Sequence, residues 1–143
     1  MAYKIFVDTN VFLDAYLKRM ENWKDSEAIL QLTAMEQITL YTSAINIVNI
    51  IYVLGKQKLN NAEIIDIIDL TLTYSQLVNS SNAAFRQALR AGFTDLEDAV
   101  QYYTAVEVKG IDYFITSNLK DYKKATIQLP VVTPKQFLSK YKL

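Results

Sequence analysis

Three stretches of this sequence place carboxylates next to predicted strands or helices. Asp8 directly follows the apolar run at residues 5–7, and Asp121 comes shortly after a second apolar run at residues 113–115. Asp95 and Asp98 are spaced i, i+3 at the start of a predicted helix, so both side chains can lie on one face of its first turn. If the fold brings these stretches together, their oxygens can bind a divalent cation.

The amino-acid composition excludes several kinds of active site. The chain contains no histidine and no cysteine, which rules out a Ser-His triad, a thiolate nucleophile and an ordinary zinc site. Carboxylates, amides, hydroxyls and lysines remain. They suit a hard cation such as Mg²⁺ or Mn²⁺.

Two of the acidic residues at residues 95–98 have a structural alternative. Asp95 is a good N-cap, and both Asp95 and Glu97 are favoured by the helix dipole at an N-terminus. Asp98 is harder to explain in this way, because its neighbours Ala99 and Tyr102 suggest that its side of the helix leans toward the core.

Two amides lie in an otherwise apolar helical stretch. Asn46 and Asn49 are spaced i, i+3 in TSAINIVNIIYVL, and an unpaired buried amide costs about 1–3 kcal/mol. Their partners are either neighbouring backbone groups or the same site as Asp8 and Asp98. The sequence leaves both possibilities open.

The pattern of apolar residues predicts an α/β fold that positions these groups. Strands are expected at residues 3–7, 38–42, 112–116 and 131–133, and helices at residues 10–19, 24–36, 43–56, 61–75, 83–91, 96–109 and after Pro134. Gly55 and Gly110 are interpreted as helix C-caps. In an open parallel sheet, ligands bind at the carboxyl ends of the strands, which is where Asp8 and the polar residues after 115 should lie.

The bulk properties predict a single domain over residues 1–143 in the cytoplasm. The chain is 51% hydrophobic, carries 15 basic and 15 acidic side chains, and shows neither a signal-peptide pattern nor an apolar run of membrane-spanning length. Any contact with nucleic acid must therefore come from a local basic patch. Lys120 is the best candidate for it, because it lies between Asn118 and Asp121.

Five segments then occur in a recognisable order: VDTNVFLDAYL, TSAINIVNIIYVL, TDLEDAVQYYTA, YFITSNLKDY and LPVVTPKQFL. In this order and at this spacing the chain resembles the PIN-domain proteins, whose best-known bacterial members are the ribonuclease toxins of VapBC pairs. The resemblance implies a three-layer α/β/α fold with a mainly parallel sheet of four to five strands. It also implies a Mg²⁺- or Mn²⁺-dependent ribonuclease, an antitoxin partner and a homodimer.

The resemblance assigns roles to the polar residues of these segments. Catalytic carboxylates are Asp8, Asp98 and Asp121; metal ligands are Asp8, Asp95, Asp98, Asp121, Asn118 and Asn49; substrate contacts are Asn10, Thr116 and Lys120. One position departs from the family pattern, since many members have a glutamate where this chain has Asn49. The site then holds one negative charge fewer, which Asp95 could replace.

Two other functions compete with this interpretation. A non-catalytic PIN-like module that binds RNA or protein would explain Asn49 as a sign of a decayed metal site. A phospho-receiver domain also has an aspartate at the end of a central strand, but Asp8 is followed by Thr9 and Asn10 instead of belonging to an acidic pair.

Overall fold

The computed structural model describes residues 2–125 and 128–141, and its centre is a parallel sheet of five strands. The order across the sheet is β3-β2-β1-β4-β5, and every neighbouring pair is parallel. The strands are β1 (Tyr3–Val7), β2 (Ile38–Ser43), β3 (Ser75–Val78), β4 (Tyr113–Ile115) and β5 (Val131–Val132).

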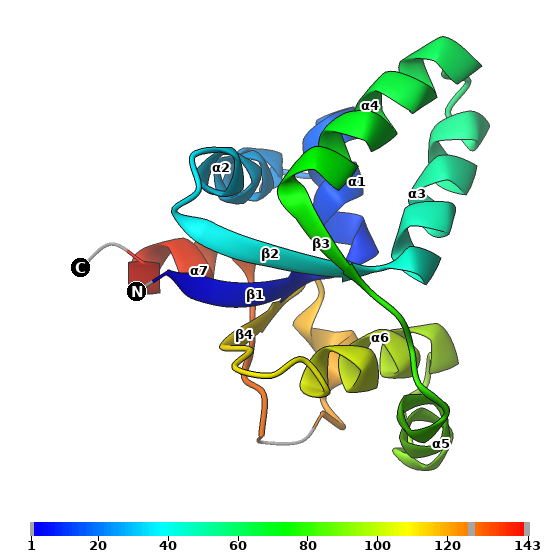
Figure 1. Ribbon diagram of the computed structural model, residues 1–143, viewed down its shortest axis with the longest axis vertical. Coiled ribbons are helices and arrows are strands. Elements are labelled where there is room, and N and C mark those ends of the chain that lie inside the picture. The colour runs from blue at the N-terminus through cyan, green and yellow to red at the C-terminus, as the bar shows by residue number, and fades with distance from the viewer. Residues whose placement is uncertain (1, 126–127, 142–143) are drawn as a thin grey trace.

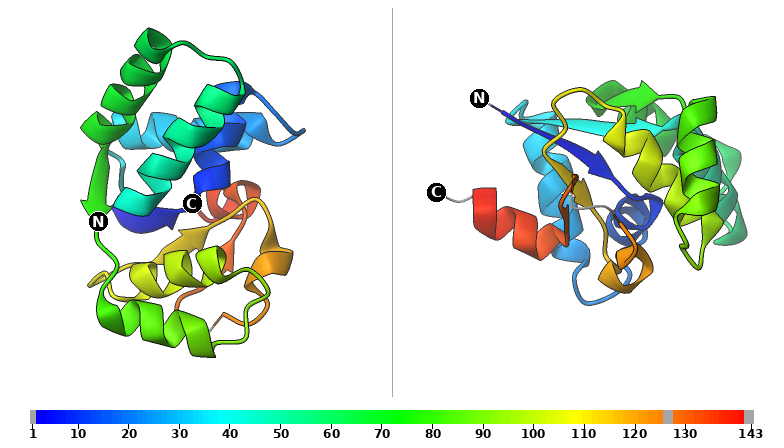
Figure 2. Two further views of the ribbon diagram at one scale, coloured as in Figure 1. Left: turned by 90° about the vertical axis from the view of Figure 1, so that its right-hand side faces the viewer. Right: turned by 90° about the horizontal axis from the view of Figure 1, so that it is seen from below.

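Helices cover both faces of this sheet (Figure 1). They are α1 (Thr9–Leu17), α2 (Trp23–Ala34), α3 (Ala44–Lys56), α4 (Asn61–Tyr74), α5 (Asn82–Arg90), α6 (Leu96–Val106), the 3-10 helix η1 (Leu119–Tyr122) and α7 (Pro134–Tyr141). Figure 1 shows α1 to α4 above the strands and α5 and α6 below them, and Figure 2 shows the same division from two further directions. The predicted three-layer α/β/α fold is confirmed.

Strand β1 sits in the middle because both of its faces are apolar. Ile5 and Val7 pack into the core beneath α1 to α4, whereas Phe6 points the other way and stacks on Phe114 at a centroid distance of 5.5 Å. A strand buried on both faces requires such an unbroken apolar run. Its carboxyl end therefore opens between the two helical layers, and Asp8 follows there.

Three local predictions were wrong. Strand β3 was not foreseen, because Ser75 and Gln76 are polar and α4 runs into the strand without a glycine or proline between them. Gly55 lies inside α3, where Gln57 is the C-cap. Gly110 has a φ of +77° but lies in the turn beyond Glu107, the C-cap of α6.

The strand order also excludes the receiver-like alternative. In that fold the order is 2-1-3-4-5, so the first strand lies beside the third. Here β1 lies between β2 and β4, and β3 is at the edge. In the described part of the chain, no helix combines the length and the apolar character that a bilayer crossing needs.

Candidate active site

Asp8 is held rigidly at the end of β1. Its backbone N–H donates to the carbonyl of Ile115 at 3.0 Å, and its side chain caps α1 by accepting from the N–H of Asn10 at 3.4 Å. The other carboxylate oxygen, Oδ2, accepts from the hydroxyls of Thr116 at 2.8 Å and Tyr122 at 3.5 Å. A carboxylate that is 2% exposed thus accepts hydrogen bonds from three groups, the N–H of Asn10 and the hydroxyls of Thr116 and Tyr122, and none of these partners is basic.

Asp98 approaches Asp8 from α6, on the other face of the sheet from α1. It lies in the first turn of α6, half-buried, while Asp95 is the exposed N-cap and accepts from the backbone N–H groups of Glu97 and Asp98. The structural role of Asp95 is confirmed by these two hydrogen bonds. Its charge nevertheless acts on Asp98, as the pKa of that residue shows.

Asp121 comes from the segment after β4. The side-chain amide of Asn118 donates to Asp121 Oδ2 at 2.9 Å, and the backbone N–H of Asn118 donates to the hydroxyl of Thr116 at 3.2 Å. Both Asn118 and Asp121 are exposed. Thr116 therefore links this corner to Asp8, since the same hydroxyl donates to the buried carboxylate.

The pKa values report how closely these acids are grouped. Burial raises the pKa of Asp8, and its hydrogen bonds oppose that rise. The pKa of Asp98 is raised from 3.8 to about 7, first by burial and then by the negative charges of Asp8, Asp95 and Asp121. Burial and the charges of Asp8, Asp98 and Asp121 also raise the pKa of Tyr122 far above its usual value of 10.0, so its hydroxyl stays protonated. The folded chain thus brings the predicted carboxylates into one electrostatic group.

A hard divalent cation fits the chemistry of this group. All the donors are oxygens, their charges repel one another, and the ion pair found among the described residues, Arg19 with Asp14, involves none of them. Within that same part of the chain, no three acidic side chains form a ready-made ligand set as they stand. Asp8, Asp98 and Asp121 would have to draw closer around an ion, which would relieve the repulsion between them.

Asn49 lies beside this group in a separate cavity of about 230 Å³. The cavity is also lined by Asn46, Glu97 and Gln101. Gln101 connects it to the acids, because its Oε1 accepts from the N–H of Thr9 at 3.4 Å and its side chain also hydrogen-bonds Asp8. Asn49 thus neighbours the carboxylates through Gln101.

Asn46 has the structural role that the sequence left open. Its Nδ2 donates to the hydroxyl of Thr42 at 3.0 Å and to the carbonyl of Val7 at 3.5 Å, tying α3 to the ends of β1 and β2. Its buried Oδ1 has no hydrogen-bond partner among the described residues.

The three residues assigned to the substrate differ in their access to solvent. Asn10 and Lys120 are exposed at the rim of the acidic group. Thr116 is completely buried and its hydroxyl is engaged with Asp8, so it acts on a substrate only through that carboxylate.

Sequence reasoning missed Tyr122 and Gln101 as parts of the site. The one signal for Tyr122 in the sequence is that it directly follows Asp121. Gln101 lies three residues after Asp98, one turn along the same helix, which is a spacing that places both toward the same neighbour.

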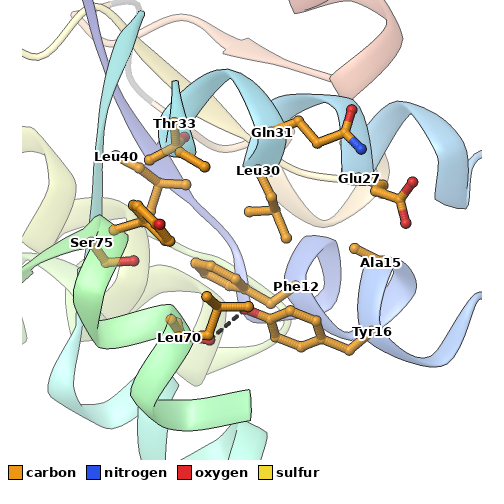
Figure 3. A pocket seen from close by; sticks show the side chains of 13 residues that line it. Phe12, Ala15, Tyr16, Glu27, Leu30, Gln31, Thr33, Leu40, Leu70 and Ser75 are labelled. Atoms are coloured by element: carbon orange, nitrogen blue, oxygen red, sulfur yellow. Dashed lines mark hydrogen bonds between the residues drawn. The ribbon is translucent and has the colours of Figure 1, made fainter. Parts of the chain in front are cut away.

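A further cavity lies away from the site carboxylates. It has a volume of about 470 Å³ and is enclosed mainly by α1, α2 and α4 over β2 (Figure 3). Its walls are largely apolar, with Phe12, Leu30 and Leu40 among them, and the hydroxyls of Tyr16 and Thr71 hydrogen-bond to each other at its side. None of the site carboxylates lines it.

Comparisons with known proteins agree with this geometry. A relative named ribonuclease VapC1, from Aquifex aeolicus, is 27% identical over 143 residues, covering 96% of this chain and 95% of its own length. Among solved structures, VapC20 of Mycobacterium tuberculosis, described as a sarcin-ricin loop cleaving toxin, superposes with a TM-score of 0.65 at 14% identity, over 88% of this chain and 98% of its own.

Two toxin–antitoxin complexes contain chains of the same fold. VapBC2 of Rickettsia felis, bound to a DNA fragment from its promoter, gives a TM-score of 0.64 at 15% identity over 91% of this chain and 98% of that one. A complex from Klebsiella pneumoniae gives 0.63 at 22% identity over 91% and 97%. The family model described as PIN domain matches residues 4–120, which include β1, the acidic start of α6 and the polar end of β4, and the chain therefore belongs to the PIN-domain family.

Proposed function

We propose that this protein is a ribonuclease that depends on Mg²⁺ or Mn²⁺ and acts as the toxin of a VapBC pair. The observation that carries the proposal is the electrostatic group of Asp8, Asp95, Asp98 and Asp121. Burial, together with the negative charges of the other three, raises the pKa of Asp98 to about 7. Groups with perturbed pKa values cluster at functional sites, and a bound cation would relieve the repulsion between these carboxylates. The relationship to ribonuclease VapC1 supports RNA as the substrate.

In this proposal Asp8, Asp98 and Asp121 hold the cation, with Asn118 beside Asp121 and with Asp95 adding negative charge. Asn49 would contribute an uncharged oxygen from the neighbouring cavity. When bound, a divalent cation would stabilise the negative charge that develops on the phosphate. It would also lower the pKa of water, so that hydroxide is available to attack the phosphate at neutral pH. This chemistry needs no histidine base.

The surrounding residues keep the carboxylates in place and meet the RNA. Thr116 and Tyr122 donate to Asp8 Oδ2 and thereby orient its carboxylate toward the site. Asn118 does the same for Asp121. Asn10 and Lys120, both exposed, contact the RNA backbone on either side of the acids.

We also propose two protein partners and a location. The structural neighbours that are toxin–antitoxin complexes support an antitoxin. A homodimer is supported by the exposed apolar side chains along α3, Ile45, Val48, Ile51 and Tyr52, because a contiguous apolar patch marks an interaction surface. Light scattering on the purified chain measures the oligomeric state, and a monomer would contradict the dimer. A toxin that acts on cellular RNA works in the cytoplasm.

The competing function is a PIN-like module that binds RNA or protein without cutting. Asn49 at the position of the usual glutamate, and the lack of a ready-made ligand set in the described residues, are the observations in its favour. It differs from our proposal in requiring no divalent cation.

Cleavage of RNA by the purified protein separates the two functions. We expect cleavage with Mn²⁺ that stops in EDTA and falls in Asp8→Asn by more than the roughly 10–100-fold that loss of an outer-shell partner costs. Asp66→Asn removes an exposed carboxylate from α4 and serves as the matched control. Metal-independent cleavage, or equal activity of Asp8→Asn and Asp66→Asn, would contradict the proposal.

A further inference from the structure

A guanidinium group lies at the rim of the acidic group and is hydrogen-bonded to Asn10, whose N–H is capped by Asp8. The N–H of Asn10 donates to Asp8 Oδ1, and Asn10 Oδ1 in turn accepts from Arg19 Nη2 at 2.9 Å. Arg19 follows α1 and is brought back along that helix to its first turn. Its position there depends on Asp14.

Asp14 holds Arg19 through both side chain and backbone. Arg19 Nε donates to Asp14 Oδ1 at 2.7 Å, and the backbone N–H of Arg19 donates to the carbonyl of Asp14 at 3.2 Å. Lys18, between them, is in the left-handed conformation that turns the chain back at the end of α1. Asp14 is 2% exposed, so this ion pair is anchored in the protein on one side.

The second oxygen of Asp14 completes a ring of hydrogen bonds that includes Asp8. Asp14 Oδ2 accepts from the hydroxyl of Ser117 at 2.8 Å, and the preceding residue, Thr116, donates to Asp8. Asp8, Asn10, Arg19, Asp14 and the 116–117 segment thus form a closed circuit. Such a circuit fixes the guanidinium relative to the carboxylates more firmly than a single surface ion pair could.

Part of the Arg19 side chain remains available to a ligand. It is 35% exposed, and its hydrogen bonds within the described residues use Nε and Nη2. That leaves Nη1, which carries two of the five N–H donors of a guanidinium. A planar group with free N–H donors suits a phosphate oxygen better than a lysine does.

RNA also needs a cationic contact here. The chain has no net charge, and its active site repels a polyanion because it is built from carboxylates. Arg19 is hydrogen-bonded to Asn10, whose N–H donates to Asp8, whereas Lys120, the lysine suggested from the sequence, lies on exposed surface.

We propose that Arg19 binds a backbone phosphate of the RNA next to the one that is cut, and that Asp14 is the positioning residue that aims the guanidinium. This inference rests on the proposed ribonuclease function. It adds a phosphate-binding contact and a residue that sets where the RNA lies relative to Asp8.

The test measures binding of a short single-stranded RNA of mixed sequence as a function of salt, in an Asp98→Asn background that blocks cleavage. Arg19→Gln should weaken binding about tenfold, as expected for loss of one charge-assisted hydrogen bond. It should also lower the slope of log K against log salt by about 0.7, the value for one neutralised phosphate of a single strand.

Three further variants separate phosphate binding from a structural effect. Ser117→Ala breaks the same ring but keeps the guanidinium, so its salt slope should not change. Lys140→Gln removes a positive charge from the end of α7 and should change nothing. The residue after Lys140, Tyr141, donates to Gln37 at the amino end of β2, whereas the acids lie at the carboxyl ends of the strands. Arg19→Lys keeps a partner for Asp14 and covers the case that Arg19→Gln fails to fold: it should weaken binding severalfold through loss of the planar fork, with an unchanged slope.

The outcomes distinguish this inference from the proposed function. If the wild type cleaves RNA but Arg19→Gln binds with an unchanged slope, or Arg19→Lys binds as tightly as the background, Arg19 does not hold a phosphate. If the wild type binds RNA without cutting it, the ribonuclease proposal fails and the slope still decides the role of Arg19. If it neither binds nor cuts RNA, both are wrong.

Discussion

Replacing Asp98 by asparagine should stabilise the metal-free protein at high pH while it abolishes activity. The pKa of this carboxyl is raised from 3.8 to about 7, so between these pH values the folded protein binds a proton that the unfolded chain has lost. The stability that this proton provides is complete below about pH 3.8 and is lost as the pH rises through 7. Asparagine carries no charge, and its variant does not suffer this loss.

The size of the effect follows from the same pKa. A rise from 3.8 to about 7 corresponds to a ceiling of about 4 kcal/mol, at about 1.4 kcal/mol per pH unit. Because Asp98 is only half-buried, water screens much of the repulsion, and we expect roughly 1–2 kcal/mol at pH 8. In a domain of this length that difference is a change in Tm of roughly 3–8 °C. Asp8 shares the effect, since the two carboxylates titrate as a coupled pair.

Thermal melts in EDTA at pH 5 and pH 8 measure this difference. Asp98→Asn should melt above the wild type at pH 8, and the gap should shrink at pH 5. Saturating Mn²⁺ should raise the melting temperature of the wild type above that of Asp98→Asn at pH 8, because the wild type gains a ligand-bound state that the variant lacks. Asp66→Asn, on the exposed side of α4, controls for the loss of one negative charge. A gap between Asp98→Asn and wild type that is the same at both pH values would refute the argument from carboxylate repulsion.

Three further predictions concern the cation and its supports. Mn²⁺ at about 100 times its Kd should stabilise the wild type by about 2.7 kcal/mol, and Asp8→Asn should lose this gain in a melt. Thr116→Val removes the hydroxyl that lowers the pKa of Asp8. Calorimetry should show Mn²⁺ binding weakened about tenfold, and melts in EDTA should show a free energy of unfolding lower by about 1 kcal/mol. Unchanged Mn²⁺ affinity would mean that the hydroxyl does not orient Asp8. Asn49→Glu should tighten Mn²⁺ binding if the side chain faces the cation, whereas unchanged affinity with a lower Tm would exclude Asn49 from the site.

The sequence predicted the parts of this fold that are encoded by local patterns. Ile5, Phe6 and Val7 are apolar on both faces, and this alone marks a central parallel strand with a functional residue after it. The helices are recovered to within a few residues, because their apolar residues recur at helical spacing. The positions of Asp8 and Asp98 follow from these two elements.

Contacts between distant segments could not be predicted in the same way. Strand β3 begins with two polar residues, lies at the sheet edge, and becomes a strand only through its pairing with β2. The bond between Ser117 and Asp14 joins residues 103 positions apart, and neither residue carries a local signal for it. Asp14 resembles an ordinary helix-surface acid in the sequence, and only its burial shows otherwise.

The two sides of the site differ in charge, and this difference bears on how many cations it can hold. On one side Asp8, Asp98 and Asp121 repel one another, with Asp95 adding to the charge. On the other side the cavity is lined by three uncharged amides, Asn46, Asn49 and Gln101, and by one carboxylate, Glu97. Asn46 already uses its amide nitrogen to hold β1 and β2. A divalent ion is bound chiefly by ligand charge, since each carboxylate offsets part of the cost of dehydrating the ion. In the proposed ribonuclease the carboxylate side would therefore hold one cation, whereas the cavity offers only Glu97 as a charged ligand for a second. The change from glutamate to Asn49 thus favours a site with a single metal ion over a decayed one.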